Sequence, residues 1–168
     1  MLHLILTADN WRIEVLDDHE IKEINQALAH CRDNRAGCIE AMNIIQKHRG
    51  WISDEAIQDI SFHLGMTPAE LDSVATFYSL IFRKPVGRHV ILLCDSVVCW
   101  MMGEEDLKMV LFDKLGIRMG ETTGDGRFTL LPNACLGICN RAPAMMIDED
   151  IHTDLTPGKL DEILDKYK

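Results

Sequence analysis

The sequence lacks the features that define several large classes of protein. No apolar run approaches the roughly 18 residues that span a bilayer, and the N-terminal stretch MLHLILTADNW has neither the basic lead nor the apolar core of a signal peptide. Neither of the glycine-rich motifs that hold nucleotide phosphates, G-x-G-x-x-G and G-x-x-x-x-G-K-[ST], is present. We therefore expect a cytoplasmic protein with no direct membrane insertion and no nucleotide site of its own.

Positive charge is also scarce. Lys and Arg number 17 against 27 Asp and Glu, which gives a net charge of −10. The excess is even, because residues 1–84 and 85–168 each carry five more acidic than basic side chains (13 against 8, and 14 against 9). The longest positive feature, Arg83, Lys84 and Arg88, is interpreted as the rim of a protein interface or as solvated charge. Without a basic stripe, nucleic acid is excluded as an expected partner.

What the first half contains is helical periodicity. One helix is predicted to open near Asp17–Asp18, and a second to run over 35–48 and end at Gly50. Ser53 is placed to cap a third, and Thr67-Pro68-Ala69-Glu70 forms a capping box for a fourth. The apolar positions expected to face a common core are Ile21, Ile24, Leu28, Cys31, Cys38, Met42, Ile45, Ile57, Ile60, Leu64, Leu71, Val74, Ala75 and Tyr78. The pattern predicts an N-terminal helical bundle over 1–84.

The second half changes to alternating strands and helices. Strands are predicted at 88–93, 128–131, 144–147 and 151–153. A helix with Glu104, Glu105 and Asp106 in an early turn follows the first strand, and Thr156-Pro157 opens a last helix. This order is similar to that of a thioredoxin-like α/β domain. We predict a mixed α+β and α/β protein, in which the bundle of 1–84 is followed over 85–168 by a thioredoxin-like domain with a small mixed sheet and flanking helices.

Four of the six cysteines form two tight pairs, Cys94 with Cys99 and Cys135 with Cys139. A reducing cytosol disfavours disulfides, and neither pair has the C-x-x-C spacing of a thioredoxin dithiol. Structural zinc is only just compatible with these spacings, whereas a [2Fe–2S] cluster takes four thiolates and tolerates C-x4-C. Spacing favours the cluster over zinc and over unrelated core thiols, and leaves all three open.

The predicted fold allows the two pairs to meet. Cys94 ends a strand, and Cys135 and Cys139 lie in a loop between two strands, so all could converge at one edge of the sheet. We expect the apolar neighbours Val97, Val98, Leu136 and Ile138 to shield the site, and the Gly137 N–H to donate to a sulfur.

Cys31 and Cys38 are interpreted as core residues. The seven histidines form no ligand pair at helical spacing, Glu104–Asp106 is interpreted as a helix-start charge cluster, and the methionine pairs as core and interface filler.

Longer motifs carry a resemblance to a known family. The segments are QKHRGWIS, VATFYSLIFRKPVGRHVI, CDSVVCW and DGRFTLLPNACLGICNRAPAMMIDED. Over about residues 12–168 the chain resembles the E subunit of bacterial NADH–quinone oxidoreductase (respiratory complex I), which is the thioredoxin-like [2Fe–2S] subunit. The resemblance implies that Cys94, Cys99, Cys135 and Cys139 are the cluster ligands. Where close relatives can carry an extra cysteine before the third ligand, this chain has Ala134.

The resemblance also implies a role in a larger assembly. It implies one-electron transfer by the cluster, with no catalytic residue and no independent activity. FMN and NADH would be bound by a partner flavoprotein (the F subunit) beside an iron–sulfur protein (the G subunit), and quinone would be reached only through the whole complex. That complex would hold the chain at the inner face of the bacterial inner membrane. The alternatives are a diaphorase subunit of an NAD-reducing hydrogenase or formate dehydrogenase, and a zinc-stabilised structural module.

Overall fold

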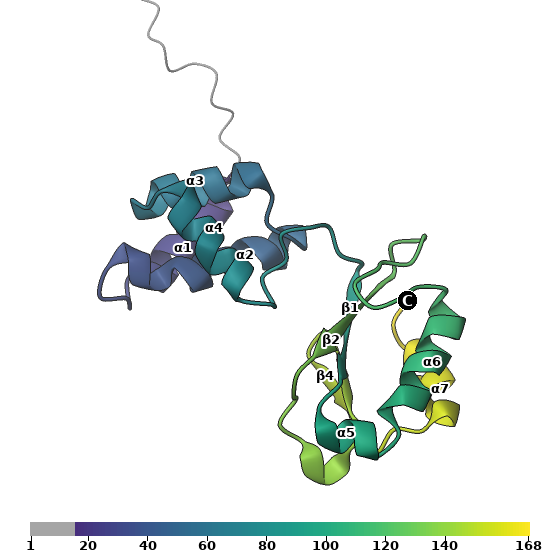
Figure 1. The fold of residues 1–168 in the computed structure, drawn as a ribbon. Helices are drawn as coiled ribbons and strands as arrows, with labels where there is room; N and C mark the ends of the chain where they lie inside the picture. The colour runs from purple at the N-terminus through teal and green to yellow at the C-terminus, as the bar shows by residue number, and fades with distance from the viewer. Residues whose placement is uncertain (1–15) are drawn as a thin grey trace, which may run out of the picture. The chain divides into compact units, whose positions relative to one another are not determined.

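The computed structural model describes residues 16–168, which form two compact units that divide between Pro85 and Val86. The N-terminal stretch, for which the sequence predicts no signal peptide, lies outside the described residues. No helix within 16–168 is long and apolar enough to cross a membrane. Each unit has its own hydrophobic core, and each is described separately below (Figure 1).

The first unit is built from four helices, three of which begin at a capping side chain. Asp17 and Glu20 form a capping box at the first helix, Ser53 accepts from the Ala56 N–H at the third, and Thr67 and Glu70 form the predicted box at the fourth. Gly50 and Gly65 end two of the helices in the left-handed conformation. The helices are α1 (Asp18–Leu28), α2 (Cys38–Arg49), α3 (Asp54–Leu64) and α4 (Pro68–Phe77).

Three sequence predictions for this unit are wrong in detail. Helix α1 ends at Leu28, so Cys31 lies in the turn beyond it and is partly exposed rather than on a buried helical face. The start of the predicted second helix is the 3-10 helix η1 (Asn34–Gly37), because Asp33 caps that turn through the Ala36 N–H. Tyr78, expected in the core, is the extended residue after α4 and is 44% exposed.

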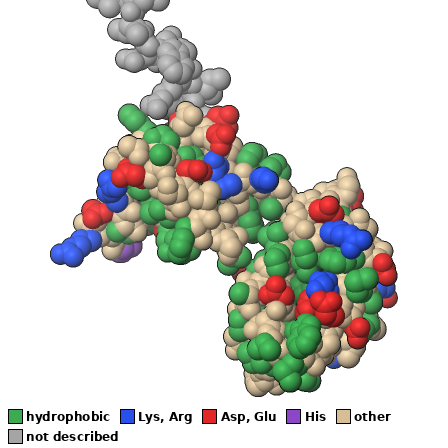
Figure 2. Space-filling view, viewed as in Figure 1, with side chains coloured by type: hydrophobic (Ala, Val, Ile, Leu, Met, Phe, Trp, Pro, Cys, Tyr) green, Lys and Arg blue, Asp and Glu red, His purple; other side chains and the backbone are tan. Residues whose placement is uncertain are grey.

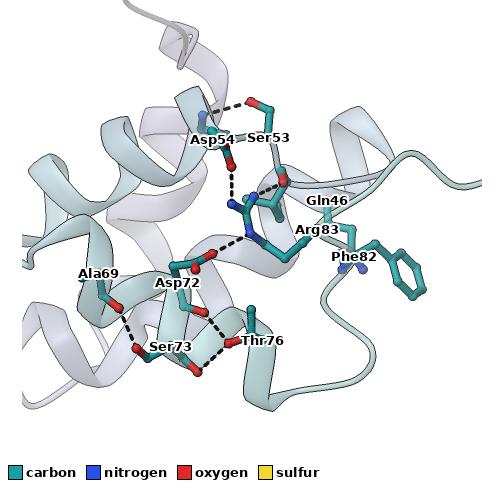
Figure 3. Close-up of polar contacts among 11 residues, drawn as sticks. Gln46, Ser53, Asp54, Ala69, Asp72, Ser73, Thr76, Phe82 and Arg83 are labelled. Carbon is teal, nitrogen blue, oxygen red and sulfur yellow. Dashed lines mark hydrogen bonds and ion pairs between the residues drawn. The ribbon is translucent and has the colours of Figure 1, made fainter.

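The segment that follows α4 is fastened to the bundle by polar contacts (Figure 3). The Gln46 side chain donates to the Leu80 carbonyl at 2.8 Å and accepts from the Phe82 N–H at 2.6 Å. Arg83 lies among three oxygens: its Nε is 2.8 Å from Asp72, its Nη2 2.5 Å from Asp54, and its Nη1 donates to the Ile52 carbonyl. Arg83 is therefore a structural cation rather than part of a solvated basic rim.

We predict that Arg83→Ala destabilises the helical unit by about 2 kcal/mol, because hydrogen bonds to charged groups contribute more than neutral ones and the freed Ile52 carbonyl loses its partner. Arg35→Ala is the matched control, since Arg35 makes a single ion pair with Glu70 at the surface and should cost clearly less. Urea unfolding followed by far-ultraviolet circular dichroism measures both. Equal losses in the two variants would contradict the anchoring role of Arg83.

The second unit contains a four-stranded mixed sheet in the order β2-β1-β3-β4. β1 pairs with β2 in parallel and with β3 antiparallel, and β3 pairs antiparallel with β4. Its elements are β1 (His89–Cys94), α5 (Val97–Met101), α6 (Glu104–Leu115), β2 (Phe128–Asn133), η2 (Cys139–Arg141), β3 (Met145–Ile147), β4 (Asp150–His152), η3 (Pro157–Lys159) and α7 (Leu160–Leu164). Helices α6 and α7 lie side by side on one face of the sheet (Figure 1), and their apolar residues share a core with Ile91 and Leu93.

The predicted fold class is confirmed: a helical N-terminal unit precedes a small mixed sheet with flanking helices. The sequence did not separate α5, which is only five residues long, from the helix that follows it. Strand β2 runs to Asn133, further than predicted, and includes Pro132. Proline is tolerated there because β2 is an edge strand, whose outer side needs no ladder hydrogen bond.

Candidate metal centre

The sheet brings the four predicted cysteines to one end of the second unit. Because β1 and β2 are parallel, their carboxyl ends meet, with Cys94 opposite Asn133. β3 runs the other way and starts there, with Met145 opposite Leu93. The loop from β2 to β3, which carries Cys135 and Cys139, therefore stays at the end where β1 delivers Cys94. α5 and this loop lie together at that end of the unit (Figure 1).

Cys94 and Cys99 form the buried pair, only 2% and 3% exposed. Cys94 is the last residue of β1, and α5 begins three residues later and places Cys99 within hydrogen-bond reach of Cys94. Burial raises the pKa of the Cys99 thiol to about 11, and the neighbouring Cys94 sulfur adds to the rise. A hydrogen bond from the Ala144 backbone opposes it by favouring the thiolate. A cation would relieve this cost by holding both sulfurs as thiolates.

Cys135 and Cys139 form the second, exposed pair. Their Sγ atoms are 4.0 Å apart, and the pKa of Cys139 is raised by the hydrogen bond to Cys135 and by the charge of that sulfur. The Gly137 N–H donates to Cys135 Sγ at 3.3 Å, as the sequence predicted. Gly137 has φ of 79°, a conformation that other residues rarely adopt, so glycine is what permits this turn between the two sulfurs.

The two pairs act on each other electrostatically, since Cys139 raises the pKa of Cys99 and Cys94 raises that of Cys139. Within residues 16–168, however, no three of these sulfurs lie within 4.8 Å of one another. A single tetrahedral zinc ion with Zn–S bonds of about 2.3 Å would need all four sulfurs about 3.8 Å apart. Two separate close pairs are compatible with a binuclear centre, in which each pair would hold one metal.

Apolar side chains cover the buried side of the centre, and backbone contacts hold its loop. Val98 and Leu136 pack against Cys94, Cys99 and Ala142, as expected for a shield. Val97 does not shield the site, because it lies outside the small core and is 64% exposed. The cysteine loop is held from behind: the Asp154 N–H donates to the Arg141 carbonyl at 2.9 Å, and the Leu155 N–H donates to the Pro143 carbonyl at 3.1 Å.

Glu104 is a buried polar residue near this end. It lies in the first turn of α6 with Glu105 and Asp106, as the sequence predicts, yet it is only 1% exposed and its Oε1 makes no hydrogen bond within the described residues. Burial raises its pKa, while Lys108, whose Nζ is 3.7 Å away, lowers it. Charge patterning along a helix start cannot reveal this, because burial of the carboxylate depends on how α5 and α6 pack.

The helix beside the centre exposes apolar side chains. Trp100 and Met101 on α5, and Met102 directly after it, are all more than half exposed, so Met101 and Met102 are not core residues. In the space-filling view, hydrophobic side chains gather over the end of the unit where α5 lies in Figure 1 (Figure 2). Exposed apolar patches of this kind are typical of protein interfaces.

Comparison with known proteins gives the family. The model of the family described as thioredoxin-like [2Fe-2S] ferredoxin matches residues 24–168. The E subunit of the NADH-quinone oxidoreductase of Escherichia coli K12 is 52% identical over 149 residues, 89% of this chain and 90% of that protein. The corresponding protein of Pseudomonas aeruginosa PAO1 is 49% identical over 153 residues, 91% of this chain and 92% of that protein.

Among solved structures, an NAD+-reducing [NiFe]-hydrogenase in the H2-reduced state is similar, with a TM-score of 0.69 and 27% identity. The match covers 78% of this chain and 22% of the hydrogenase chain, so this chain corresponds to about a fifth of that larger one. The family match spans both units and includes all four paired cysteines. The chain belongs to the thioredoxin-like [2Fe–2S] ferredoxin family.

Proposed function

We propose that this chain is the [2Fe–2S] electron-transfer subunit of an NADH–quinone oxidoreductase. The observation that supports this best is the two cysteine pairs at one end of the sheet, in a chain about half identical to E-subunit proteins over nine-tenths of its length. The chain is part of an oxidoreductase and performs no substrate chemistry alone. When bound, the cluster supplies one-electron transfer, and the protein sets its position and its potential.

In this proposal Cys94 and Cys99 hold one iron, and Cys135 and Cys139 hold the other. Two Fe(III) ions, two sulfides and four thiolates give the oxidised site a formal charge of about −2, and reduction adds one more negative charge. The net charge of −10 opposes that step. Two backbone groups favour it, because the Gly137 N–H donates to Cys135 and the Ala144 backbone to Cys99. The potential follows from the balance of these terms.

The donor of electrons lies on a partner chain in this proposal. FMN and NADH are bound by the flavoprotein (the F subunit), with the iron–sulfur protein (the G subunit) in the same complex, and quinone is reached only through the whole assembly. The names of the relatives support the assembly, and the missing phosphate-binding glycine motifs support a nucleotide site elsewhere. The complex would place this cytoplasmic chain at the inner face of the bacterial inner membrane.

Both units offer surface for docking that flavoprotein. In the helical unit the large side chains Phe77, Tyr78 and Leu80 are exposed, with the Phe77 and Tyr78 rings 5.2 Å apart in an edge-on arrangement. In the second unit the exposed residues of α5 adjoin the centre. We assign docking to the helical unit and cluster binding to residues 85–168, with α5 as the part of the interface nearest the cluster.

The hydrogenase match supports an alternative host. The matched 78% of the chain is more than residues 86–168 alone provide, so it includes part of the helical unit. An equivalent diaphorase subunit of an NAD-reducing hydrogenase or formate dehydrogenase would use the same cysteines. The higher identity to the E-subunit proteins favours the quinone oxidoreductase. A zinc-stabilised module is disfavoured, since the sulfurs lie in two separate pairs.

The ligand assignment is tested by replacing each cysteine. Cys94→Ser, Cys99→Ser, Cys135→Ser and Cys139→Ser should each lose the cluster or perturb it strongly, because each removes one of four thiolates. Cys31→Ala and Cys38→Ala are controls, since both residues belong to the helical unit. Iron and acid-labile sulfide are measured for each chain. Loss of iron from either control, or full iron with an unchanged visible spectrum in any of the four serine variants, would refute the assignment.

The electron donor is tested with paramagnetic resonance of the reduced cluster. The isolated chain should give no signal with NADH and a full signal with dithionite, because nothing in its sequence is typical of a nucleotide site. After addition of the flavoprotein, NADH should reduce the cluster to an extent set by its potential. Reduction of the isolated chain by NADH alone would overturn the proposal that a flavin on a partner is the donor.

The docking surface is tested with Phe77→Ser and Trp100→Ser, which remove exposed side chains and leave both cores intact. Each should weaken binding to the flavoprotein, by about 2 kcal/mol where the residue is an interface hot spot, while the visible spectrum of the cluster stays the same. Ile151→Ser, an exposed apolar residue on β4, is the control. If Phe77→Ser binds as tightly as the parent chain, docking by the helical unit is wrong.

A further inference from the structure

A second group of metal-ligating side chains lies in the helical unit, which carries none of the paired cysteines. His19 and Glu23 are four residues apart on α1, and His48 is in the last turn of α2. His48 Nε2 is 2.7 Å from one Glu23 carboxylate oxygen, and His19 Nδ1 is 3.8 Å from the other. One ligand atom from each residue lies within 4.8 Å of the other two. Periodicity within one helix missed the group, because His48 comes from another helix.

The backbone holds this group together independently of the imidazoles. Residues four apart face the same side of a helix, so His19 and Glu23 are neighbours by geometry. Helices α1 and α2 are packed through Ile24, Met42 and Ile45, all fully buried. Beside the group, Arg49 on α2 forms an ion pair with the buried Glu20 on α1, and this pair also holds the two helices together.

Two imidazoles and one carboxylate are a donor set that zinc and related divalent ions accept. We propose that His19, Glu23 and His48 bind one divalent transition-metal ion of the zinc class, with water completing the coordination. His19 has 67% of its side chain exposed, so the fourth position faces solvent and the ion can enter directly. The ion would join the start of α1 to the end of α2. This site is independent of the proposed electron transfer.

The surrounding charges allow such an ion. The hydrogen bond from His48 lowers the pKa of Glu23, so this carboxylate is ionised at neutral pH. Asp17 lies close enough to His19 for their charges to interact, and it adds negative charge beside the site. Lys47 places a positive charge near Glu23, which opposes binding of a cation. His48 is in the last turn of α2, where the helix dipole favours a cation.

The test uses the full chain with its iron–sulfur cluster in place, so that the paired cysteines are occupied. Zinc chloride is titrated at about pH 7.5 by isothermal calorimetry, and we expect one binding site. His19→Ala, His48→Ala and Glu23→Gln should each weaken it by about tenfold or more, since loss of even an outer partner of a metal ligand costs that much. His63→Ala is the matched control: its ring also bridges two helices, 2.8 Å from Asn25, but without a carboxylate.

Nuclear magnetic resonance of the imidazoles provides a second reading that does not depend on stoichiometry. Zinc should shift the ring signals of His19 and His48 and leave those of His63 unchanged. Circular dichroism of each variant checks that the helices remain folded. The proposal is overturned if zinc leaves the His19 and His48 signals in place, or if the His19→Ala/His48→Ala double variant binds zinc as the parent chain does.

Discussion

The parallel pairing of β1 with β2 is the constraint on which the metal centre depends. It places Cys94 and Asn133 opposite each other, so the chain leaves both strands at the same end of the sheet. Strand β3 then returns antiparallel to β1 from that end. If β2 ran the other way, its loop would carry Cys135 and Cys139 to the far end, a strand length from Cys94. The direction in which these two six-residue strands pair thus decides whether the four thiols can form one site.

Within that frame the two pairs differ in environment. Cys94 and Cys99 are both buried, and burial raises the pKa of the Cys99 thiol, whereas Cys135 and Cys139 face solvent. The buried pair belongs to a strand end and a helix, both held by the core. The exposed pair belongs to a loop fastened by the Asp154 and Leu155 backbone. An electron carrier needs both properties: a rigid attachment, and an edge close enough to the surface for exchange with a partner.

The sequence revealed what depends on local chemistry. The helix starts predicted near Asp17–Asp18 and at the Thr67 capping box are correct, and the cysteine pairs pointed to the end of the sheet at which they lie, because caps, periodicity and ligand spacing are properties of neighbours in the chain. It missed what depends on packing between distant segments. Glu104 is buried by neighbouring helices, and Arg83 finds its partners 29 and 11 residues away in Asp54 and Asp72. His48 meets Glu23 only because α2 packs on α1.

Both units carry large apolar side chains on their surfaces. A folded chain normally buries large side chains such as Phe77 and Trp100, which are 80% and 59% exposed here. Neither is needed by its own core, since the buried clusters of both units are complete without them. Each unit therefore has a stable interior and a separate apolar surface. In the proposed function the cluster meets a redox group on another chain, and this apolar surface would then hold that partner in place beside the cysteine site.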